Sequence, residues 1–180
     1  LRAAVAAQTE VGKKAKALMS SGQLVTDDIV IGIIRDRINE SDCGWGFILD
    51  GFPRTLEQAK SLESMLKLRM EFIDRVIEIQ VNKEEIVKRI IGRYSCSNCG
   101  ANYHDLFNPV KKQGVCDFCG NKQFTRREDD NENTVRLRFE TYYNDTKPLI
   151  PFYEEKGLIF KIDGMEAIEE VSKKIEKLLN

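Results

Sequence analysis

The sequence lacks the long apolar runs and the signal segment that mark membrane and secreted proteins. No stretch approaches the roughly 18 uncharged apolar residues of a membrane span, and the first twenty residues lack the basic, apolar and small-residue regions of a signal peptide. Internal repeats and low-complexity tracts are absent as well. We therefore expect a cytoplasmic protein without a membrane partner, whose 180 residues allow one sizeable core and a small inserted lobe.

An excess of charge is also missing. The 28 Lys and Arg residues nearly balance the 29 Asp and Glu residues, so the formal net charge is −1. Within residues 96–119 two lysines cancel two aspartates when the only histidine is counted as neutral. Because nucleic-acid binding depends on a basic surface, we expect no nucleic-acid partner. Aromatic rings in this segment could stack on bases, but packing within the lobe is their more common role: Tyr103, Phe107 and Phe118.

Four of the five cysteines form two CxxC pairs, with sixteen residues between the pairs. Thiols stay reduced in the cytoplasm, so this spacing favours a metal site over disulfides. Four thiolates complete the tetrahedral shell of a structural zinc ion and leave no open position for catalysis. We predict that zinc staples a lobe too small to form its own core, with the ligands Cys96, Cys99, Cys116 and Cys119.

The remaining cysteine and the only histidine have ordinary interpretations. Cys43 fits a small buried residue beside a turn better than a redox group. His104 fits a hydrogen-bonding role within the lobe better than a fifth zinc ligand or a general base, because four thiolates already satisfy zinc.

Helical and strand patterns alternate along the rest of the chain. Helices are predicted within the Ala-rich residues 1–19, from an N-cap at Thr26 through Ile38, over 55–66, from an N-cap at Asn82 through Ile91, over 133–144, before Gly157, and over 168–179. Strands are predicted at 47–49, 75–81 and 158–164. This alternation favours an α/β fold in which helices cover a parallel sheet, with a zinc-bearing excursion near residues 92–130.

Two of the predicted strands end alike, in FILDG and FKIDG. Ligands bind beyond the carboxyl ends of parallel strands, which places Asp50 and Arg54 where chemistry is expected. The carboxylate suits hydrated magnesium and the guanidinium suits phosphate oxygens. A strand-ending turn with a solvated ion pair is the alternative for Asp-Gly alone, whereas the longer string LDGFPRT is more specific.

Arginines gather on both sides of the cysteine segment. Arg89 and Arg93 precede it, four residues apart and expected on one helical face, and further arginines follow it: Arg126, Arg127, Arg136 and Arg138. The planar guanidinium favours bidentate recognition, for which neighbouring acids or a bound polyphosphate could supply the partner. A salt-bridged surface is the commoner role of any single arginine.

These motifs occur in a recognisable order. The chain carries LRAAV, GQLVTDD, FILDGFPRT, IIGR, ANYH, RREDDNENTVRLR and PLIPFYEEKG, with Gln58 between the third and fourth. Over essentially its whole length it resembles bacterial-type adenylate kinases with a long zinc-bearing lid. The resemblance implies a monomeric kinase with an α/β fold of the P-loop kinase type, which transfers a phosphoryl group reversibly between ATP and AMP, giving two ADP, with magnesium. It also implies an AMP-binding lobe over 1–25, a core over 26–91 and 131–180, and a lid over 92–130.

The resemblance further implies roles for individual residues. Asp50 holds magnesium through water, while the catalytic arginines are Arg54, Arg93, Arg127 and Arg138. Residues matching the AMP site are Arg2, Gln23, Leu24, Val25, Gly51, Phe52, Arg54, Gln58, Arg127 and Arg138. Residues matching the ATP site are Arg89, Arg93, Tyr103, His104 and Glu166.

One expected motif is missing. Such kinases carry a glycine-rich phosphate loop, GxxxxGK[ST], before the segment that Leu1 and Arg2 match, and the only Gly-Lys pair, at Gly12, has Ala7 where the first glycine would stand. We therefore expect a P-loop kinase fold that is incomplete at its N-terminal end, and little or no turnover by this chain. The alternatives are another nucleoside monophosphate kinase, a non-catalytic nucleotide binder, and a zinc-ribbon protein that binds nucleic acid.

Overall fold

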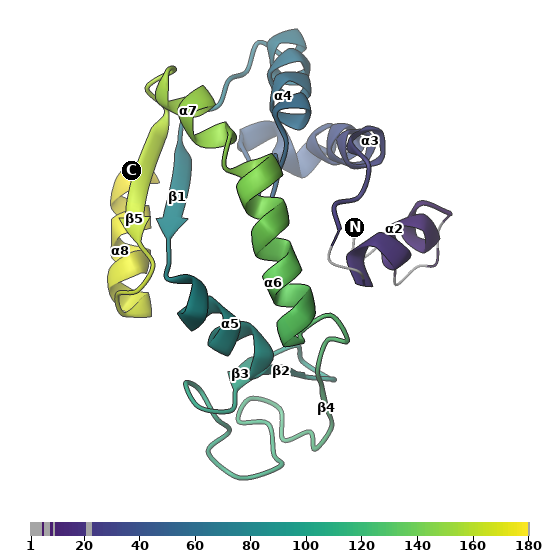
Figure 1. Cartoon of the computed structure of the whole chain (residues 1–180), viewed down its shortest axis with the longest axis vertical. Coiled ribbons are helices and arrows are strands. Elements are labelled where there is room, and N and C mark those ends of the chain that lie inside the picture. The colour runs from purple at the N-terminus through teal and green to yellow at the C-terminus, as the bar shows by residue number, and fades with distance from the viewer. Residues whose placement is uncertain (1–4, 6–7, 9, 21–22, 180) are drawn as a thin grey trace.

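Figure 1 shows a computed structural model, which describes residues 5, 8, 10–20 and 23–179. Two strands, β1 (Val76–Gln80) and β5 (Ile159–Asp163), pair in parallel, with Val76 opposite Ile159. A separate antiparallel sheet lies at the other end of the chain's long axis and has the order β3-β2-β4. Its strands are β2 (Arg93–Cys96), β3 (Asn102–His104) and β4 (Phe124–Thr125).

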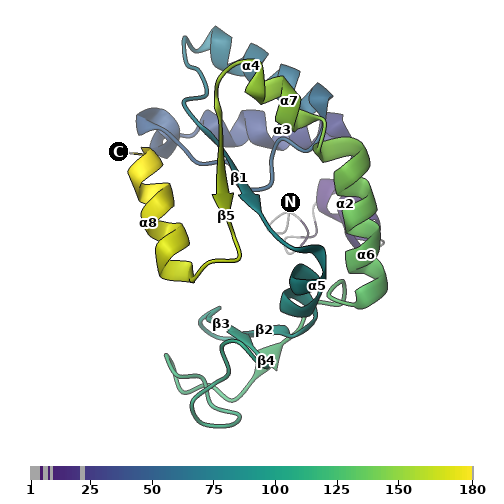
Figure 2. The same cartoon turned by 60° about the vertical axis from the view of Figure 1, so that its left-hand side comes forward.

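Helices surround the parallel pair, which confirms the predicted α/β class. They are α2 (Glu10–Ser20), α3 (Asp27–Ile38), α4 (Leu56–Leu68), α5 (Lys83–Ile91), α6 (Glu132–Thr141), α7 (Leu149–Glu154) and α8 (Ile168–Leu179). A 3₁₀ turn, η1 (Ser41–Trp45), follows α3, and a π-turn, η2 (Tyr142–Thr146), continues α6. Figure 2 shows α8 running beside β5. None of the described helices has the length and apolarity that crossing a bilayer requires.

Local capping explains where several helices begin. The Asn82 side chain accepts hydrogen bonds from the backbone N–H groups of Glu84 and Glu85, and Thr55 and Asn131 cap α4 and α6 in the same way. At Thr26 the prediction is half right. The residue precedes α3, but its hydroxyl makes no capping bond to that helix.

Two apolar clusters hold the helices together. Ile38, Phe52, Leu62 and Leu66 join α3 to α4, while a second cluster, Ala59 with Leu149 and Tyr153, joins α4 to α7. Because Phe52 belongs to the first cluster, burial of apolar surface anchors the loop before α4. We call residues 50–55 the DGFPRT turn.

Two local predictions are wrong. Residues 47–49 form no strand, because no described strand pairs with them; Phe47 and Leu49 instead pack on the first cluster, and the Ile48 side chain is 81% exposed. Arg93 does not share a helical face with Arg89, since α5 ends at Ile91 and Arg93 begins β2. A Cβ at Gly92 would lie 2.4 Å from the His104 ring, so this close approach requires glycine between the two elements.

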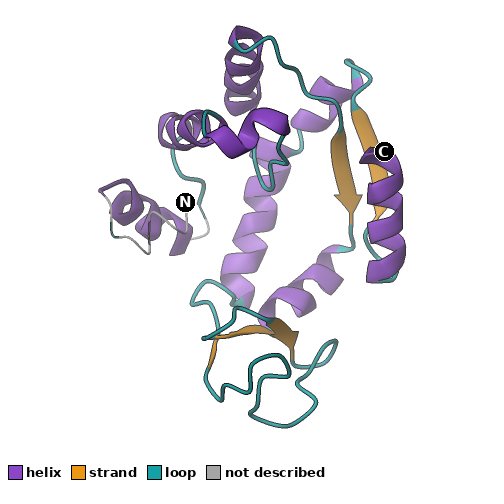
Figure 3. Ribbon diagram, turned by 180° about the vertical axis from the view of Figure 1, so that it is seen from behind, coloured by secondary structure: helices purple, strands orange, loops and turns teal. Residues whose placement is uncertain are grey.

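Residues 92–130, which we call the cysteine lobe, contain the antiparallel sheet. Seen from behind in Figure 3, the lobe hangs from the ends of α5 and α6. Its small core consists of Cys96, Tyr103 and Cys116, and the Tyr94 and Phe124 rings pack around it. The lobe is therefore joined to α5 on one side and to α6 on the other, and arginines lie near both junctions.

Candidate functional site

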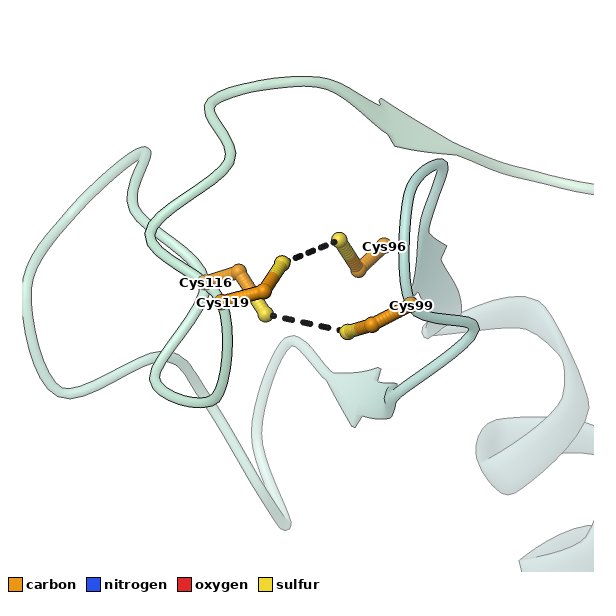
Figure 4. Close-up of side chains that lie close together, drawn as sticks. All are labelled: Cys96, Cys99, Cys116 and Cys119. Carbon is orange, nitrogen blue, oxygen red and sulfur yellow. Dashed lines mark hydrogen bonds between the residues drawn. The ribbon is translucent and has the colours of Figure 1, made fainter.

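The four lobe cysteines converge as the CxxC spacing predicts. Figure 4 shows their side chains pointing toward one centre, with Sγ–Sγ distances of 3.6 Å for the pairs Cys96–Cys119 and Cys99–Cys116. All four sulfur atoms lie within 4.8 Å of one another. Four thiolates bound to one zinc ion at about 2.3 Å would lie about 3.8 Å apart, so the observed cluster fits a tetrahedral zinc site.

The backbone around the two pairs is built alike. Gly100 N–H donates to the Cys96 carbonyl at 3.0 Å, and Gly120 N–H donates to the Cys116 carbonyl at 2.9 Å. Both glycines have left-handed φ angles, +73° and +71°, which side chains rarely adopt. The CxxCG repeat therefore forms two equivalent knuckles that present their sulfur atoms to a shared centre.

The surroundings favour the thiolate form at Cys96 and Cys116, whereas at Cys99 the bond from Ala101 N–H is outweighed by burial and by hydrogen bonding with neighbouring sulfur atoms, which raise its pKa to about 12. The backbone N–H of Cys99 is the strongest influence on the Cys96 thiol and helps to lower its pKa to about 6. The Tyr103 hydroxyl lies 3.3 Å from Cys116 Sγ and accepts a bond from Asp117 N–H at 2.8 Å. Burial raises the pKa of Tyr103 to about 12, so its hydroxyl stays protonated and can donate to the sulfur.

His104 connects the cysteine lobe to α5. Its Nδ1 accepts hydrogen bonds from the N–H groups of Leu106 and Phe107, at 3.0 and 3.2 Å. This leaves Nε2 as the donor to the Lys88 carbonyl, 3.1 Å away near the end of α5. His104 is buried and separate from the cysteine cluster, so the structure gives it the hydrogen-bonding role that the sequence favours.

Arg93 and Arg138 meet at two adjacent carboxylates, Asp130 and Asp129. Arg93 makes a two-pronged ion pair with Asp130, with N–O distances of 2.6 and 2.7 Å, and the Asp130 side chain is only 2% exposed. Arg138 of α6 bonds to Asp129 and lies 3.9 Å from Asp130. Hydrogen bonding to Asp130 raises the pKa of Arg93. The Arg127 carbonyl accepts a bond from Asp130 N–H, which places the Arg127 backbone beside this group.

The DGFPRT turn holds Arg54 by its backbone and its side chain. Arg54 N–H donates to Gln58 Oε1 at 2.7 Å, and Arg54 Nε donates to the Gly51 carbonyl at 2.8 Å. Gln58 is buried, and its Nε2 donates to Asp27 of α3 at 2.7 Å. Asp50, the first residue of this turn, is exposed. The structure therefore brings the predicted residues Gly51, Arg54 and Gln58 together.

The residues that match an ATP site lie on separate elements. Arg89 of α5 donates to the Gly164 carbonyl at 3.3 Å, in the turn that follows β5. Glu166 of the same turn pairs with Lys174 at 2.5 Å, so its carboxylate already has a partner. Arg89 and the Glu166 turn are adjacent, whereas Tyr103 and His104 have their side chains buried within the cysteine lobe.

Two cavities flank the π-turn η2. One, of about 430 Å³, is lined by Leu18, Gln23, Leu24, Thr141 and Asp145. The other, of about 440 Å³, lies against β1 and α5 and includes Arg138, Tyr142 and Tyr143 in its wall. Gln23 and Leu24, which are predicted to line the AMP site, thus line a cavity. Val25, the next residue in the sequence, is buried. Arg2 lies outside the described residues.

Sequence reasoning missed some of the polar contacts of this site. Asp27 accepts from both Thr55 and Gln58, at 2.9 and 2.7 Å, and Thr146 donates to the Arg54 carbonyl at 2.9 Å. In the sequence, Asp27 is simply an acid in the first turn of α3, where the helix dipole favours it. None of these three pairs could be found from spacing, because their members lie 28 to 92 residues apart in the chain.

Comparison with known proteins identifies the arrangement. A protein-family model described as adenylate kinase matches residues 1–158. The chain belongs to the adenylate kinase family. Its relatives include the adenylate kinase of Allorhizobium ampelinum, which is 53% identical over all of this chain and 83% of the relative. The adenylate kinase of Magnetococcus marinus is 54% identical over 95% of this chain and 80% of the relative. The adenylate kinase of Archaeoglobus fulgidus is 51% identical over 99% of this chain and 82% of its own length.

Family membership defines the class of chemistry. The chain is a phosphotransferase of the nucleoside monophosphate kinase class, and its parallel strands with covering helices agree with the P-loop kinase fold. For an adenylate kinase family member, the arginines around Asp129 and Asp130 and the tethered Arg54 are the natural candidates for phosphate binding.

Proposed function

We propose that the site transfers a phosphoryl group reversibly between Mg·ATP and AMP, giving two ADP. The observation that carries this proposal is the meeting of Arg93 and Arg138 at the Asp129–Asp130 pair, where the cysteine lobe joins α6. The transferred phosphoryl group spreads its charge over oxygen atoms in a loose transition state. Preorganised guanidinium groups stabilise that charge without reorganising at the moment of reaction.

On the AMP side, the DGFPRT turn and the cavity beside α2 supply the contacts. Arg54, together with Arg2, binds the AMP phosphate, and Gln58 recognises the adenine. The backbone of Gln23, Leu24 and Val25 lines the pocket together with Gly51 and Phe52. The restrained backbone of Arg54 supports this assignment, because a guanidinium held in place loses less freedom when it binds phosphate.

On the ATP side, Arg89 packs against adenine beside the main chain at Glu166, and Arg93, Arg127 and Arg138 meet the phosphates. Asp50 holds the magnesium of Mg·ATP through water, a role that fits its exposed carboxylate. The cysteine lobe, residues 92–130, acts as a lid whose Tyr103–His104 segment covers the nucleotide. Residues 1–25 form the AMP lobe, and closure of both excludes water from the reaction.

Zinc in the lid is structural. The four cysteines fit the ion in number and in sulfur separation, and they fill a tetrahedral shell completely. Bound zinc supplies cross-linking of the two knuckles and takes no part in the transfer. The lid then keeps its shape while it opens and closes.

Binding of a bisubstrate analogue tests the proposal. We expect a diadenosine pentaphosphate to bind the zinc-loaded chain, and Arg138→Lys to weaken it about 10-fold or more, from the usual worth of a charged hydrogen bond. Arg136→Lys is the matched control, because Arg136 lies on the same helix but pairs with Glu132 and Glu84. Unchanged affinity in Arg54, Arg127 and Arg138 variants alike would refute the proposed site. Titration with AMP, GMP and UMP distinguishes an adenylate kinase from its sister kinases.

A further inference from the structure

Thr146 makes a contact that none of the roles above uses. It ends the π-turn η2, and its hydroxyl donates to the backbone carbonyl of Arg54 at 2.9 Å, across 92 residues of sequence. We propose that Thr146 is a positioning residue, which fixes the DGFPRT turn against α6 and so sets the place of the AMP phosphate. This inference rests on the proposed function, in which Arg54 binds that phosphate.

The Arg54 backbone is held from two directions. Its N–H donates to Gln58 Oε1 at 2.7 Å, and its carbonyl accepts from Thr146. Gln58 is itself fixed by Asp27, and its side chain is fully enclosed at 2% exposure. The α3 and α4 side of the turn is therefore anchored to buried groups. Thr146 supplies an anchor on the opposite, α6 side.

The π-turn places this anchor on the same rod as a catalytic candidate. Lys147 N–H bonds to the Tyr142 carbonyl at 2.8 Å, an i to i+5 bond that admits one residue more than an α-helical turn. The turn continues α6, which carries Arg138. Arg138 and the hydroxyl that holds Arg54 thus belong to one continuous helical segment, residues 132–146.

This linkage has a consequence for phosphoryl transfer. The two reacting phosphates must approach in line, and small misplacements of the groups that hold them are costly. Because one helical segment carries Arg138 and also holds the Arg54 backbone, it fixes the positions of the two guanidinium groups relative to each other. The end of α6 and the turn also line the two cavities, with Thr141 and Asp145 on one and Tyr142 and Tyr143 on the other.

Replacing Thr146 by valine and by serine separates the hydroxyl from the rest of the side chain. Thr146→Val keeps the shape and removes the donor, so we expect AMP affinity to fall about 3- to 10-fold, the range that one neutral hydrogen bond supplies. Thr146→Ser keeps the donor and should bind AMP as the parent chain does. Ser64→Ala is the matched control, because Ser64 also donates to a backbone carbonyl, that of Lys60 in α4.

Calorimetry with AMP and hydrogen exchange of the nucleotide-free chain provide the readouts. We expect faster exchange at the Arg54 and Gln58 amides in Thr146→Val, with little change in Thr146→Ser and Ser64→Ala. Equal AMP affinity in Thr146→Val and the parent chain would overturn the inference, as would equal losses in the Val and Ser variants. Arg54→Ala separates the proposed AMP site from the proposed role of Thr146. If Arg54→Ala leaves AMP affinity unchanged, the proposed AMP site is wrong. If Arg54→Ala weakens AMP binding and Thr146→Val does not, only the role of Thr146 is rejected.

Discussion

Asp130 provides the sharpest test of how the arginine group is held together. Asp130→Asn preserves the shape of the side chain but removes its charge, and it turns an N–H donor or a neutral oxygen toward the Arg93 guanidinium. The change disrupts two short bonds, at 2.6 and 2.7 Å, on a carboxylate that is 2% exposed. It also removes the attraction to Arg138, 3.9 Å away.

The expected cost follows from burial. Hydrogen bonds to a charged group contribute about 1.5–3 kcal/mol each when solvent is excluded. The Arg93 side chain is 35% exposed, however, so water replaces part of what is lost. We expect the free energy of unfolding to fall by about 2 kcal/mol in total, after this discount for solvent screening. For a protein of this size, that corresponds to a drop of about 4–8 °C in Tm.

A second ion pair in the lobe supplies the control. Arg126 and Asp105 are also 2.6 Å apart, but their side chains are 51% and 48% exposed. Asp105→Asn should therefore change stability by less than about 1 kcal/mol, as for other exposed pairs. The assay is calorimetric unfolding of the zinc-loaded chain with and without each substitution. Equal losses for the two variants, or no loss for Asp130→Asn, would show that burial does not decide the strength of these pairs.

Two further predictions concern the lid. Removing zinc with a strong chelator should lower Tm, because a ligand that binds only the native state stabilises that state. Cys99→Ser should lose the metal, whereas Cys43→Ser should retain it. A Tm that is unchanged after verified metal loss would contradict a structural role. At His104, an Asn side chain can replace the Nδ1 acceptor, and a Gln side chain can replace the Nε2 donor. Hydrogen exchange at the Leu106 and Phe107 amides should therefore accelerate in His104→Gln and stay slow in His104→Asn. Equal exchange rates in the two variants would refute the assigned bonding.

Much of the site could be predicted because its signals are local. The two cysteines of each CxxC pair are three positions apart in the sequence, and the structure confirms that the sulfur atoms of all four converge. The predicted N-cap at Asn82 depends on hydrogen bonds from residues two and three positions later. The ordered motifs, from FILDGFPRT to RREDDNENTVRLR, were enough to indicate the family that the comparisons confirm.

The sequence by itself determined the family, the convergent cysteines and most helices, because these depend on residue types at fixed spacing or in a fixed order. Only the tertiary structure decided that 47–49 stay unpaired, that Arg93 meets Asp130 across 37 residues, and that Thr146 holds Arg54. An arginine or a threonine has the same local pattern whether it is solvated or bonded. Its partner is selected when the chain folds back on itself, and that selection depends on contacts that no spacing rule contains.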